Sequence, residues 1–378
     1  MNVLVLNSGS SSLKFQLIHV DNEKILEKGV IDGIGLPTCK FIINGVTKQQ
    51  KIKNHTEAIK IVLSHIPLEK IDAIGHRVVH GGENYSEATV ITPAVIRVID
   101  RLSELAPLHN PPNLAGIIAC KKMMPKIKQV AIFDTAFHQT IPEKAYLYGI
   151  PYEFYKKYKI RKYGFHGTSH KYVMQQAQKM LGKKNVNLIT CHLGNGSSIT
   201  AIKNGKSVDT TMGLTPLQGL MMGTRSGDID PEIVAFLSNK EKMSAHDVIK
   251  LLNKQSGLKG ICGYSDVRTI HDKSSQAKCK LALDMFAYRI LEYIGAYHAV
   301  VGKTDAIVFT AGIGQGAWYL RKTICNALAH IGVVVDAKKN RKHELVITTP
   351  RSKVKVLIIP TNEELMIAKE TKKVLSKR

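Results

Sequence analysis

The sequence predicts an α/β protein made of two similar domains that face a shared cleft. Apolar runs alternate with stretches of helical periodicity, and a small-residue turn between two strands occurs twice. The runs that indicate buried strands are residues 3–6, 73–79, 130–133, 188–191, 306–310 and 354–359. At 378 residues the chain is long for a single core. We expect one domain over residues 1–148 plus 361–378 and another over residues 149–360.

The repeated turn has the composition of a phosphate-binding loop. Residues 7–12 read NSGSSS and lie between two strands, the second over residues 13–18. Hydroxyls, an amide and a glycine suit a backbone that approaches an anion closely, although an ordinary surface turn explains this stretch alone equally well. Near the midpoint of the chain, GSSI at residues 196–199 repeats SSSL at residues 10–13. The repeat favours two homologous domains with one phosphate turn each.

A third glycine segment, residues 310–316, follows a strand and precedes a helix near residues 318–329. Nucleotides bind at such strand–glycine–helix junctions in open α/β sheets. Neither of the two serine-rich turns matches a Walker P-loop or a Rossmann fingerprint. Two further helices are predicted. Residues 275–301 carry apolar side chains at steps of three and four, and a capping box from Thr361 to Glu364 begins the last helix.

Composition argues against several classes of protein. Apolar residues make up 44% and charged residues 22%, as in soluble globular proteins, and no apolar run approaches the roughly 20 residues of a membrane helix. We expect no secretory signal, because the first apolar stretch lacks a basic start and is broken at Asn7. The six scattered cysteines predict reduced thiols and a cytoplasmic location. The net charge of +24 permits nucleic acid as a partner, but it is spread along the chain, and nine Phe and one Trp offer few stacking surfaces.

Eight motifs, in order along the chain, resemble those of the acetokinase family, within the superfamily of acetate and sugar kinases, heat-shock 70 proteins and actin. They read NSGSSSLKFQL, GHRVVHGG, APLHNPPN, FDTAFHQT, YGFHGTSHKYV, CHLGNGSS, MGTRSGDIDP and IPTNEEL. The resemblance covers essentially the whole chain. It implies two actin-like, ribonuclease H-like domains facing a central nucleotide cleft. It also implies reversible, direct in-line phosphoryl transfer between ATP and acetate, which gives ADP and acetyl phosphate.

The same resemblance implies Mg²⁺ as cofactor, with Mn²⁺ as an alternative, ATP and acetate as small-molecule substrates, and a homodimer. Within the family, the alternative is a kinase of propionate or another short-chain acid. Two other classes compete: a basic nucleic-acid-binding protein, and an ATPase of the superfamily that hydrolyses ATP to drive conformational change. Formation of acetyl phosphate distinguishes these classes, because only a kinase needs acetate.

Phosphoryl transfer to a carboxylate requires aligned reactants, neutralised charge and exclusion of water. By the resemblance, Arg77 orients the carboxylate, Arg225 bridges it to the phosphoryl group, and His166 donates to a phosphoryl oxygen. His109 lies near the substrate. Asp134 is the family's proton donor or acceptor. Ionised acetate has no proton to lose, however, so orienting a metal-bound water or an arginine is at least as good a role for Asp134.

The resemblance also assigns binding roles motif by motif. The metal ligands are Asn7 and Glu363, with Glu364 as the alternative. The groups that meet phosphate or metal-bound water are Lys14, Ser10 and Ser12. The residues that hold ATP are His192, Leu193, Gly194, Asn195, Gly196, Asp266, Val267, Arg268, Gly312, Ile313, Gly314, Gln315 and Gly316. The chain departs from the family at Gln315 and Gly316, where its members usually have Glu and Asn.

The methyl group of acetate calls for an apolar pocket beside Arg77. Val79 follows Arg77 by two residues and shares its face if the strand continues. By the resemblance, Leu108, Phe165 and Pro216 enclose the same methyl group. Each of these residues could equally be plain core. The chain is also somewhat shorter than is typical of the family, and we expect the loss near residues 37–52, as a trimmed peripheral hairpin.

Overall fold

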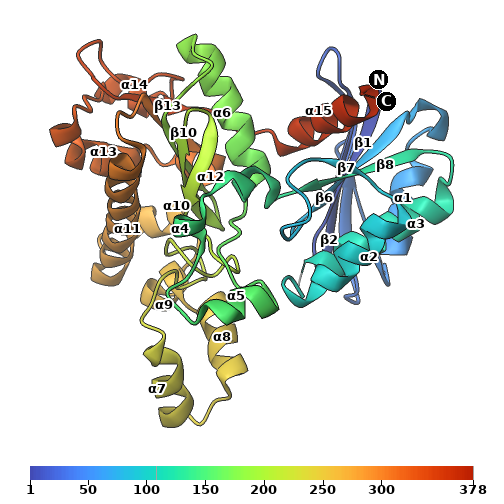
Figure 1. Ribbon diagram of the computed structural model, residues 1–378, viewed down its shortest axis with the longest axis horizontal. Coiled ribbons are helices and arrows are strands. Elements are labelled where there is room, and N and C mark those ends of the chain that lie inside the picture. Colours follow the sequence, from blue (N-terminus) through green and yellow to red (C-terminus); the bar gives the residue numbers. More distant parts are fainter. Residues whose placement is uncertain (108, 378) are drawn as a thin grey trace. The chain divides into compact units, whose positions relative to one another are not determined.

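The computed structural model describes residues 1–107 and 109–377, and its backbone forms two compact units (Figure 1). The first unit comprises Met1–Gln139, Gly167–Ser169 and Asn362–Arg378, and the second comprises Thr140–His166 and His170–Thr361. Residues 140–148, which we expected in the first domain, belong to the second unit. The α/β class is confirmed, because each unit contains one sheet with helices packed on it.

The sheet of the first unit has the strand order β5-β4-β3-β2-β1-β6-β8-β7. β1, β2 and β3 form an antiparallel meander, and β1, β6 and β8 run parallel. β4 and β5 extend the meander as a hairpin within residues 37–52. The strands are β1 Asn2–Ser8, β2 Ser12–His19, β3 Lys24–Asp32, β4 Cys39–Ile43, β5 Val46–Gln50, β6 Ala73–Val78, β7 Thr89–Val90 and β8 Lys128–Phe133.

The sheet of the second unit has the order β11-β10-β9-β12-β13. β9, β10 and β11 form an antiparallel meander, and β9, β12 and β13 run parallel. This pattern repeats β3-β2-β1-β6-β8, so the internal duplication predicted from the two serine-rich turns is confirmed. The strands are β9 Leu188–Leu193, β10 Ser197–Lys203, β11 Lys206–Thr210, β12 Ala306–Thr310 and β13 Lys355–Ile358.

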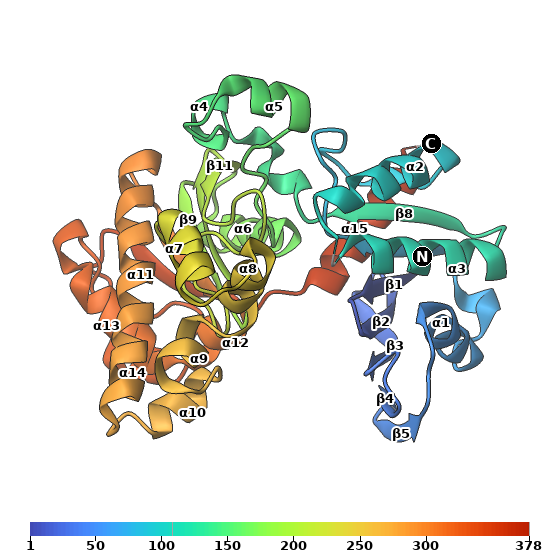
Figure 2. The same ribbon diagram turned by 90° about the horizontal axis from the view of Figure 1, so that it is seen from below.

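Helices cover both faces of the first sheet. α1 and α3 pack on one face and α15 on the other (Figure 2). Leu4 and Leu6 of β1 belong to the core shared with α1 and α3, whereas Gly75 of β6 lies against Ile367 and Thr371 of α15. The helical segments are α1 His55–Ser64, η1 Leu68–Lys70, α2 Pro93–Arg101, η2 Leu102–Glu104, α3 Asn110–Met123, η3 Ala136–Thr140 and α15 Glu363–Ser376.

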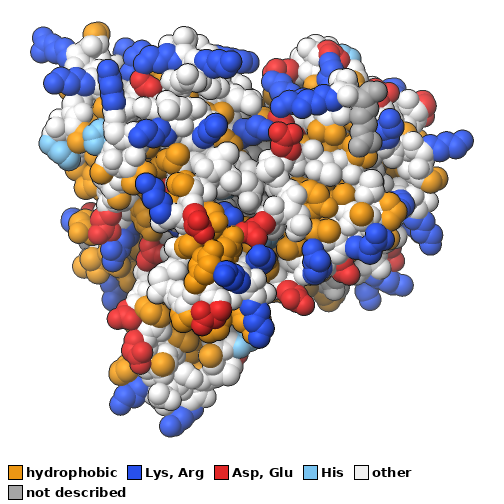
Figure 3. Space-filling view, viewed as in Figure 1, with side chains coloured by type: hydrophobic (Ala, Val, Ile, Leu, Met, Phe, Trp, Pro, Cys, Tyr) orange, Lys and Arg blue, Asp and Glu red, His pale blue; other side chains and the backbone are white. Residues whose placement is uncertain are grey.

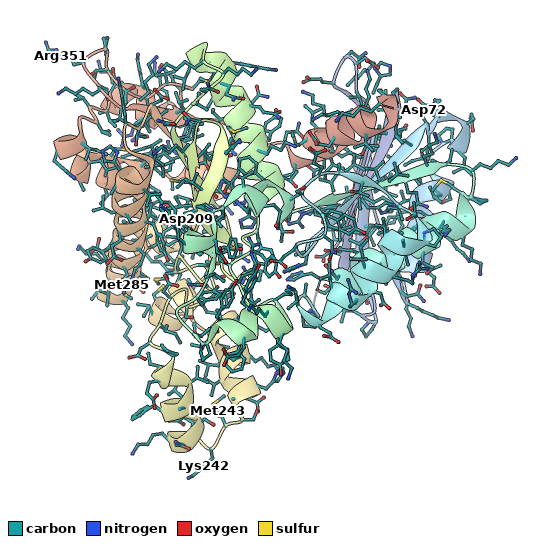
Figure 4. All side chains as sticks on the ribbon, in the orientation of Figure 1. Asp72, Asp209, Lys242, Met243, Met285 and Arg351 are labelled. Carbon is teal, nitrogen blue, oxygen red and sulfur yellow. The ribbon has the colours of Figure 1, made fainter. Side chains whose placement is uncertain are left out.

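The core of the second unit is built on one long helix, α11, over Ala277–Val301. This confirms the helix predicted over residues 275–301. Lys242 and Met243 lie in the connection between α7 and α8 (Figure 4). The other helices are α4 Glu143–Tyr146, α5 Tyr152–Tyr158, α6 Gly167–Leu181, α7 Glu232–Lys240, α8 Ala245–Lys254, α9 Gly257–Cys262, α10 Val267–Asp272, α12 Ala311–Gly316, α13 Trp318–Ala327, η4 Ala329–Ile331 and α14 Ala337–Arg341.

Three expectations about local structure are wrong. The N-cap of α15 is Asn362, whose side chain accepts a hydrogen bond from the backbone N–H of Leu365 at 2.9 Å, so Thr361 is not the cap. Residues 311–316 form the short helix α12 directly after β12 instead of an open turn. β6 ends at Val78, so Val79 lies beyond the strand.

Three features of residues 1–107 and 109–377 bear on the expectations from composition: the distribution of basic side chains, the helices and the cysteines. Lys and Arg side chains are spread over the visible face of both units and mixed with other side chains (Figure 3). No helix within residues 1–107 and 109–377 has the length and apolarity needed to cross a membrane. All six cysteines belong to the described residues, and each is a free thiol.

Candidate active site

Separate segments of the first unit bring their side chains together around Arg77. Its Nη1 donates to Oδ1 of Asn7 at 3.2 Å, and its Nη2 donates to Oδ2 of Asp134. Its Nε lies 3.8 Å from Oε2 of Glu363, in the first turn of α15. Asn7, Arg77 and Asp134 are neighbours because β1, β6 and β8 are parallel and end at the same edge of the sheet.

The cluster around Arg77 contains both acidic and basic side chains, and they shift one another's pKa values. The carboxyl groups of Asp134, Glu363 and Glu364 act on one another in the presence of two cations, Arg77 and Lys14. Burial by itself lowers the pKa of Arg77, but Asp134 and Glu363 raise it above its ordinary value, so the guanidinium stays charged. Burial raises the pKa of Glu363. Arg77 opposes this shift and the other two carboxylates add to it, so the pKa of Glu363 reaches about 7.

Asp134 is held by hydrogen bonds to both of its carboxylate oxygens. Its side chain is 1% exposed. Oδ1 accepts from the hydroxyl of Thr168 at 3.0 Å, and Oδ2 accepts from Arg77. Both carboxyl oxygens are therefore engaged as acceptors, which fixes the orientation of the Asp134 side chain. Thr168 was not selected from the sequence.

The first serine-rich turn is shorter than the sequence indicates. Asn7 pairs with Lys14 across β1 and β2, and the backbone N–H of Gly9 donates to the carbonyl of Ser12 at 2.8 Å. The loop proper is residues 9–11. Ser10 and Lys14 are exposed. The buried ring of His55, in α1, lies 2.7 Å from the carbonyl oxygen of Gly9 and holds the turn; the sequence analysis missed this residue.

The donor set beside Arg77 fits a hard divalent cation. Asn7 offers an amide oxygen and Glu363 a carboxyl oxygen, and the carboxyl groups of Asp134 and Glu364 act on the same site. Within residues 1–107 and 109–377, no group of three or more His, Cys, Asp or Glu side chains is arranged to hold a metal ion. Mg²⁺ needs no such cage, because it commonly binds one or two carboxylates, substrate phosphates and several waters.

In the second unit, two histidines contact one hydroxyl, and a third histidine stacks on one of them. Nδ1 of His166 lies 2.9 Å from Oγ of Ser198, and Nε2 of His170 lies 2.8 Å from the same oxygen. His170 also contacts Oγ1 of Thr190 at 2.7 Å. The His166 ring stacks on His192 with centroids 4.1 Å apart. His166 has a left-handed backbone, φ +56°, which a non-glycine residue adopts at a cost and which is common at functional sites. His170 and Ser198 were not selected from the sequence.

Arg225 is a half-buried cation with no acidic partner in residues 1–107 and 109–377. Its Nη1 donates to the carbonyl of Pro216 at 3.2 Å and approaches Sδ of Met222 at 3.6 Å. No carboxylate among the described residues forms an ion pair with it, and burial lowers its pKa. A Cβ atom built on Gly196 would lie 3.4 Å from Nη1 of Arg225 and 3.6 Å from His166. Gly196 of the second serine-rich turn therefore lies within contact distance of both Arg225 and His166.

The second turn repeats the first. Leu193 ends β9, Ser197 begins β10, and the N–H of Gly194 donates to the carbonyl of Gly196 at 3.1 Å. The carbonyl of Asn195 accepts from the N–H of Gly223 at 3.4 Å, in the loop that carries Arg225.

Two other expected ATP-binding segments have clear structural partners. Asp266 caps α10 by accepting from the N–H groups of Arg268 and Thr269, and it pairs with the exposed Arg268 side chain at 2.8 Å. Val267 is buried. In α12, the carbonyls of Gly314 and Gln315 accept from the buried Arg321 at 2.7 and 2.6 Å. The sequence analysis overlooked Arg321; Gly312, Ile313 and Gly316 complete α12.

The expected acyl-pocket residues are divided between the units. Val79, in the first unit, is 6% exposed, and its N–H donates to Oδ1 of Asn113 at 3.0 Å. Phe165 is buried and Pro216 half-buried, both in the second unit. Leu108 lies outside the described residues, and His109 follows it at the N-cap position of α3 without capping the helix through its side chain.

The chain is similar to proteins of one family along its whole length. The acetokinase family model matches residues 2–369. The acetate kinase of Carboxydothermus hydrogenoformans is 53% identical, over 98% of this chain and 98% of that protein. The crystal structure of Porphyromonas gingivalis acetate kinase superposes with a TM-score of 0.95 at 44% identity, covering 99% of both chains. A propionate kinase from Francisella tularensis gives the same TM-score at 45% identity, covering 98% of this chain and 99% of that one.

Proposed function

Because this chain belongs to the acetokinase family, we propose that it catalyses reversible phosphoryl transfer between ATP and acetate, giving ADP and acetyl phosphate. An acetate oxygen attacks the γ-phosphorus of ATP, the bond from that phosphorus to the bridging oxygen breaks, and ADP leaves. The observation that carries the proposal is the convergence of Asn7, Arg77, Asp134 and Glu363 in the first unit.

Arg77 binds the acid. Of its five N–H donors, one is committed to Asn7 and one to Asp134, so the others can donate to a carboxylate. Asp134 keeps the guanidinium in place through its ion pair, while Thr168 fixes the carboxylate from the other side. We therefore assign Asp134 an orienting role and no proton transfer.

Asn7 and Glu363 would hold Mg²⁺, with Glu364 as the alternative to Glu363. The ion, when bound, supplies positive charge to the nucleotide phosphates and so neutralises part of the charge that phosphoryl transfer brings together. Because Asn362 and not Thr361 caps α15, Glu364 does not belong to a capping box, and its carboxyl group is available as a metal ligand. Lys14, Ser10 and Ser12 would meet phosphate oxygens or metal-bound water.

In the second unit, Arg225 and His166 would stabilise the transferred phosphoryl group. Arg225 has a guanidinium with no acidic partner among the described residues, so an anionic ligand would supply the missing charge. His166 is fixed by Ser198 and by stacking on His192, which limits its rotation. The residues that would hold ATP are those of the second turn, residues 192–196, of the segment 266–268 and of α12. We further propose a cytoplasmic homodimer that binds neither nucleic acid nor membranes.

A hydroxylamine trap tests the proposal, because it converts acetyl phosphate to a coloured hydroxamate. Purified protein with MgATP and acetate is expected to form hydroxamate, and to form ADP only when acid is present. An ATPase that drives conformational change would release ADP without acid. A nucleic-acid-binding protein would do neither, and would instead retain a labelled duplex at physiological salt.

Propionate is the second candidate substrate, because one solved relative is a propionate kinase. One methylene in an apolar pocket changes kcat/KM by roughly 10–200-fold, so propionate should be a poorer substrate than acetate and still react. Val79→Ala should narrow the acetate-to-propionate ratio, mainly through the KM of the acid. An unchanged ratio together with a loss of stability typical of a core truncation would identify Val79 as plain core.

A further inference from the structure

One buried amide joins the two strand ends that carry the acid- and metal-binding residues. Asn113, in α3, is 3% exposed. Its Nδ2 donates to the carbonyl of Ser8 at 2.6 Å, and its Oδ1 accepts from the N–H of Val79 at 3.0 Å. Ser8 is adjacent to Asn7, and Val79 follows Arg77 by two residues. The side-chain amide of Asn113 therefore donates to the segment that carries Asn7 and accepts from the segment that carries Arg77.

The amide lies where backbone pairing between these strands has stopped. The parallel ladder of β1 and β6 runs from Val3 with Ala73 to Leu6 with His76 and goes no further. Beyond the ladder, two links join these segments in the described part of the chain. Arg77 donates to Asn7, and Asn113 bonds to both Ser8 and Val79. Asn113 thus supplies a donor and an acceptor in the place of the next ladder bonds.

A glycine allows α3 to come this close. Gly116 lies one turn after Asn113, and a Cβ atom built on it would be 2.7 Å from Oγ of Ser8. Real Cβ atoms do not approach an oxygen so closely, so a side chain at this position would crowd the Ser8 hydroxyl and require it, or α3, to move.

We propose that Asn113 is a positioning residue that sets the distance between Asn7 and Arg77, and thereby tunes binding of Mg²⁺ and of the acid. The inference rests on the proposed function for the identity of these two ligands. Asn113 touches neither ligand, so it acts only through Ser8 and Val79. A shift of about 1 Å in a binding group can change a rate by roughly 100-fold, which makes such control detectable.

The chain offers a matched control in Asn110. It is 0% exposed and lies one turn before Asn113 on α3. Its Oδ1 accepts from the N–H of His80 at 3.1 Å, and its Nδ2 donates to the carbonyls of His80 and Ile99 at 3.1 and 3.3 Å. Asn110 therefore holds the segment after β6 as firmly as Asn113 does, without a bond to β1.

The experiment compares Asn113→Ala with Asn110→Ala. Both variants should unfold at lower urea concentration, because each leaves buried backbone groups unpaired. We expect MgCl₂ alone to raise the melting temperature of the wild-type protein. Only Asn113→Ala should abolish this rise and raise the KM of acetate, by about tenfold or more. Equal changes in the two variants, or a loss of stability with unchanged KM and unchanged response to MgCl₂, would overturn the proposal.

A second variant, Gly116→Ala, keeps the amide and crowds Ser8 at the end of β1. It should weaken the response to MgCl₂ in the same direction as Asn113→Ala, and it provides the test if the latter does not fold. The MgCl₂ response needs no turnover, so it separates two failures. Wild-type protein that forms no acetyl phosphate contradicts the proposed function, whereas an Asn113→Ala response equal to that of Asn110→Ala contradicts the positioning role.

Discussion

The two arginines at the candidate site have opposite electrostatic surroundings. Arg77 pairs with Asp134 and lies near Glu363, and these carboxylates raise its pKa above the ordinary value. Among the described residues, the guanidinium of Arg225 contacts a carbonyl and a thioether and forms no ion pair, and burial lowers its pKa. Arg77 is therefore held in a fixed orientation before any substrate binds, whereas Arg225 keeps its charge available for a ligand.

Replacing Arg225 should separate catalysis from stability. Arg225→Ala is expected to lower kcat by a factor of about 100 or more, as for arginines that clamp a transferred phosphoryl group. The midpoint of urea unfolding should stay close to that of the wild type, because the substitution breaks no ion pair. Arg321→Ala is the contrasting variant. Arg321 is 1% exposed and donates to carbonyls of α12 and to Asn340, so its loss should lower the midpoint clearly. A lower midpoint for Arg225→Ala that matches its loss of activity would show a structural arginine.

Asp134→Asn should be severely impaired without a change in the shape of the pH–rate profile. The amide fills the same space but cannot form the ion pair with Arg77, so the guanidinium loses its anchor. We expect kcat/KM for acetate to fall by about 100-fold or more. The measurement is kcat/KM against pH for both proteins. A limb of the profile present in the wild type and absent in the variant would assign proton transfer to Asp134.

At the residue scale, motifs located most of the site and geometry added the rest. Asn7, Arg77 and Asp134 follow strands that parallel pairing brings to one edge, so a sequence argument can place them together. Thr168 donates its hydroxyl to Asp134, and the hydroxyl of Ser198 contacts both His166 and His170. In the sequence, Thr168, Ser198 and His170 look like ordinary polar residues. Their role depends on a contact between distant segments, which one sequence alone does not specify.

At the scale of secondary structure, the errors occur at element ends. TNEE at residues 361–364 contains two good N-cap residues in succession, and propensity alone does not choose between Thr361 and Asn362. The structure chooses Asn362, which moves the whole first turn by one residue. Likewise, three glycines in α12 argue against a helix, yet Arg321 stabilises it by donating to carbonyls in its last turn.

Removing the α15 cap should affect stability and metal binding together. Asn362→Ala is expected to lower the free energy of unfolding by about 1 kcal/mol. Glu363 is the first residue of this helix, so the stabilisation by MgCl₂ should also decrease. Ser244 caps α8 by accepting from the N–H of Asp247 at 3.1 Å, and it is the matched control.

For Ser244→Ala, urea unfolding should show a similar loss of stability, and the melting temperature should respond to MgCl₂ as in the wild type. If Asn362→Ala also keeps the full wild-type response, the first turn of α15 does not place a metal ligand.

At the scale of the whole molecule, the duplicated sheet was the most predictable feature. Each unit contains the same five-strand order, with its serine-rich turn between the first two strands of an antiparallel meander. Small-residue turns and buried apolar runs specify this pattern locally, so the sequence alone is sufficient to predict the duplicated sheet. The division of the chain at residues 139 and 140 depends on tertiary contacts and differs from the expected position near residue 148.

The central claim is that the chain moves a phosphoryl group between a nucleotide and a carboxylate in both directions. The most direct test supplies the protein with acetyl phosphate and MgADP and measures ATP by luciferase luminescence. We expect ATP to form, its formation to stop when EDTA removes the metal, and Arg225→Ala to form at least about 100-fold less ATP than the wild type. Folded wild-type protein that makes no ATP from acetyl phosphate, while hydrolysing ATP without acid, would contradict the central claim.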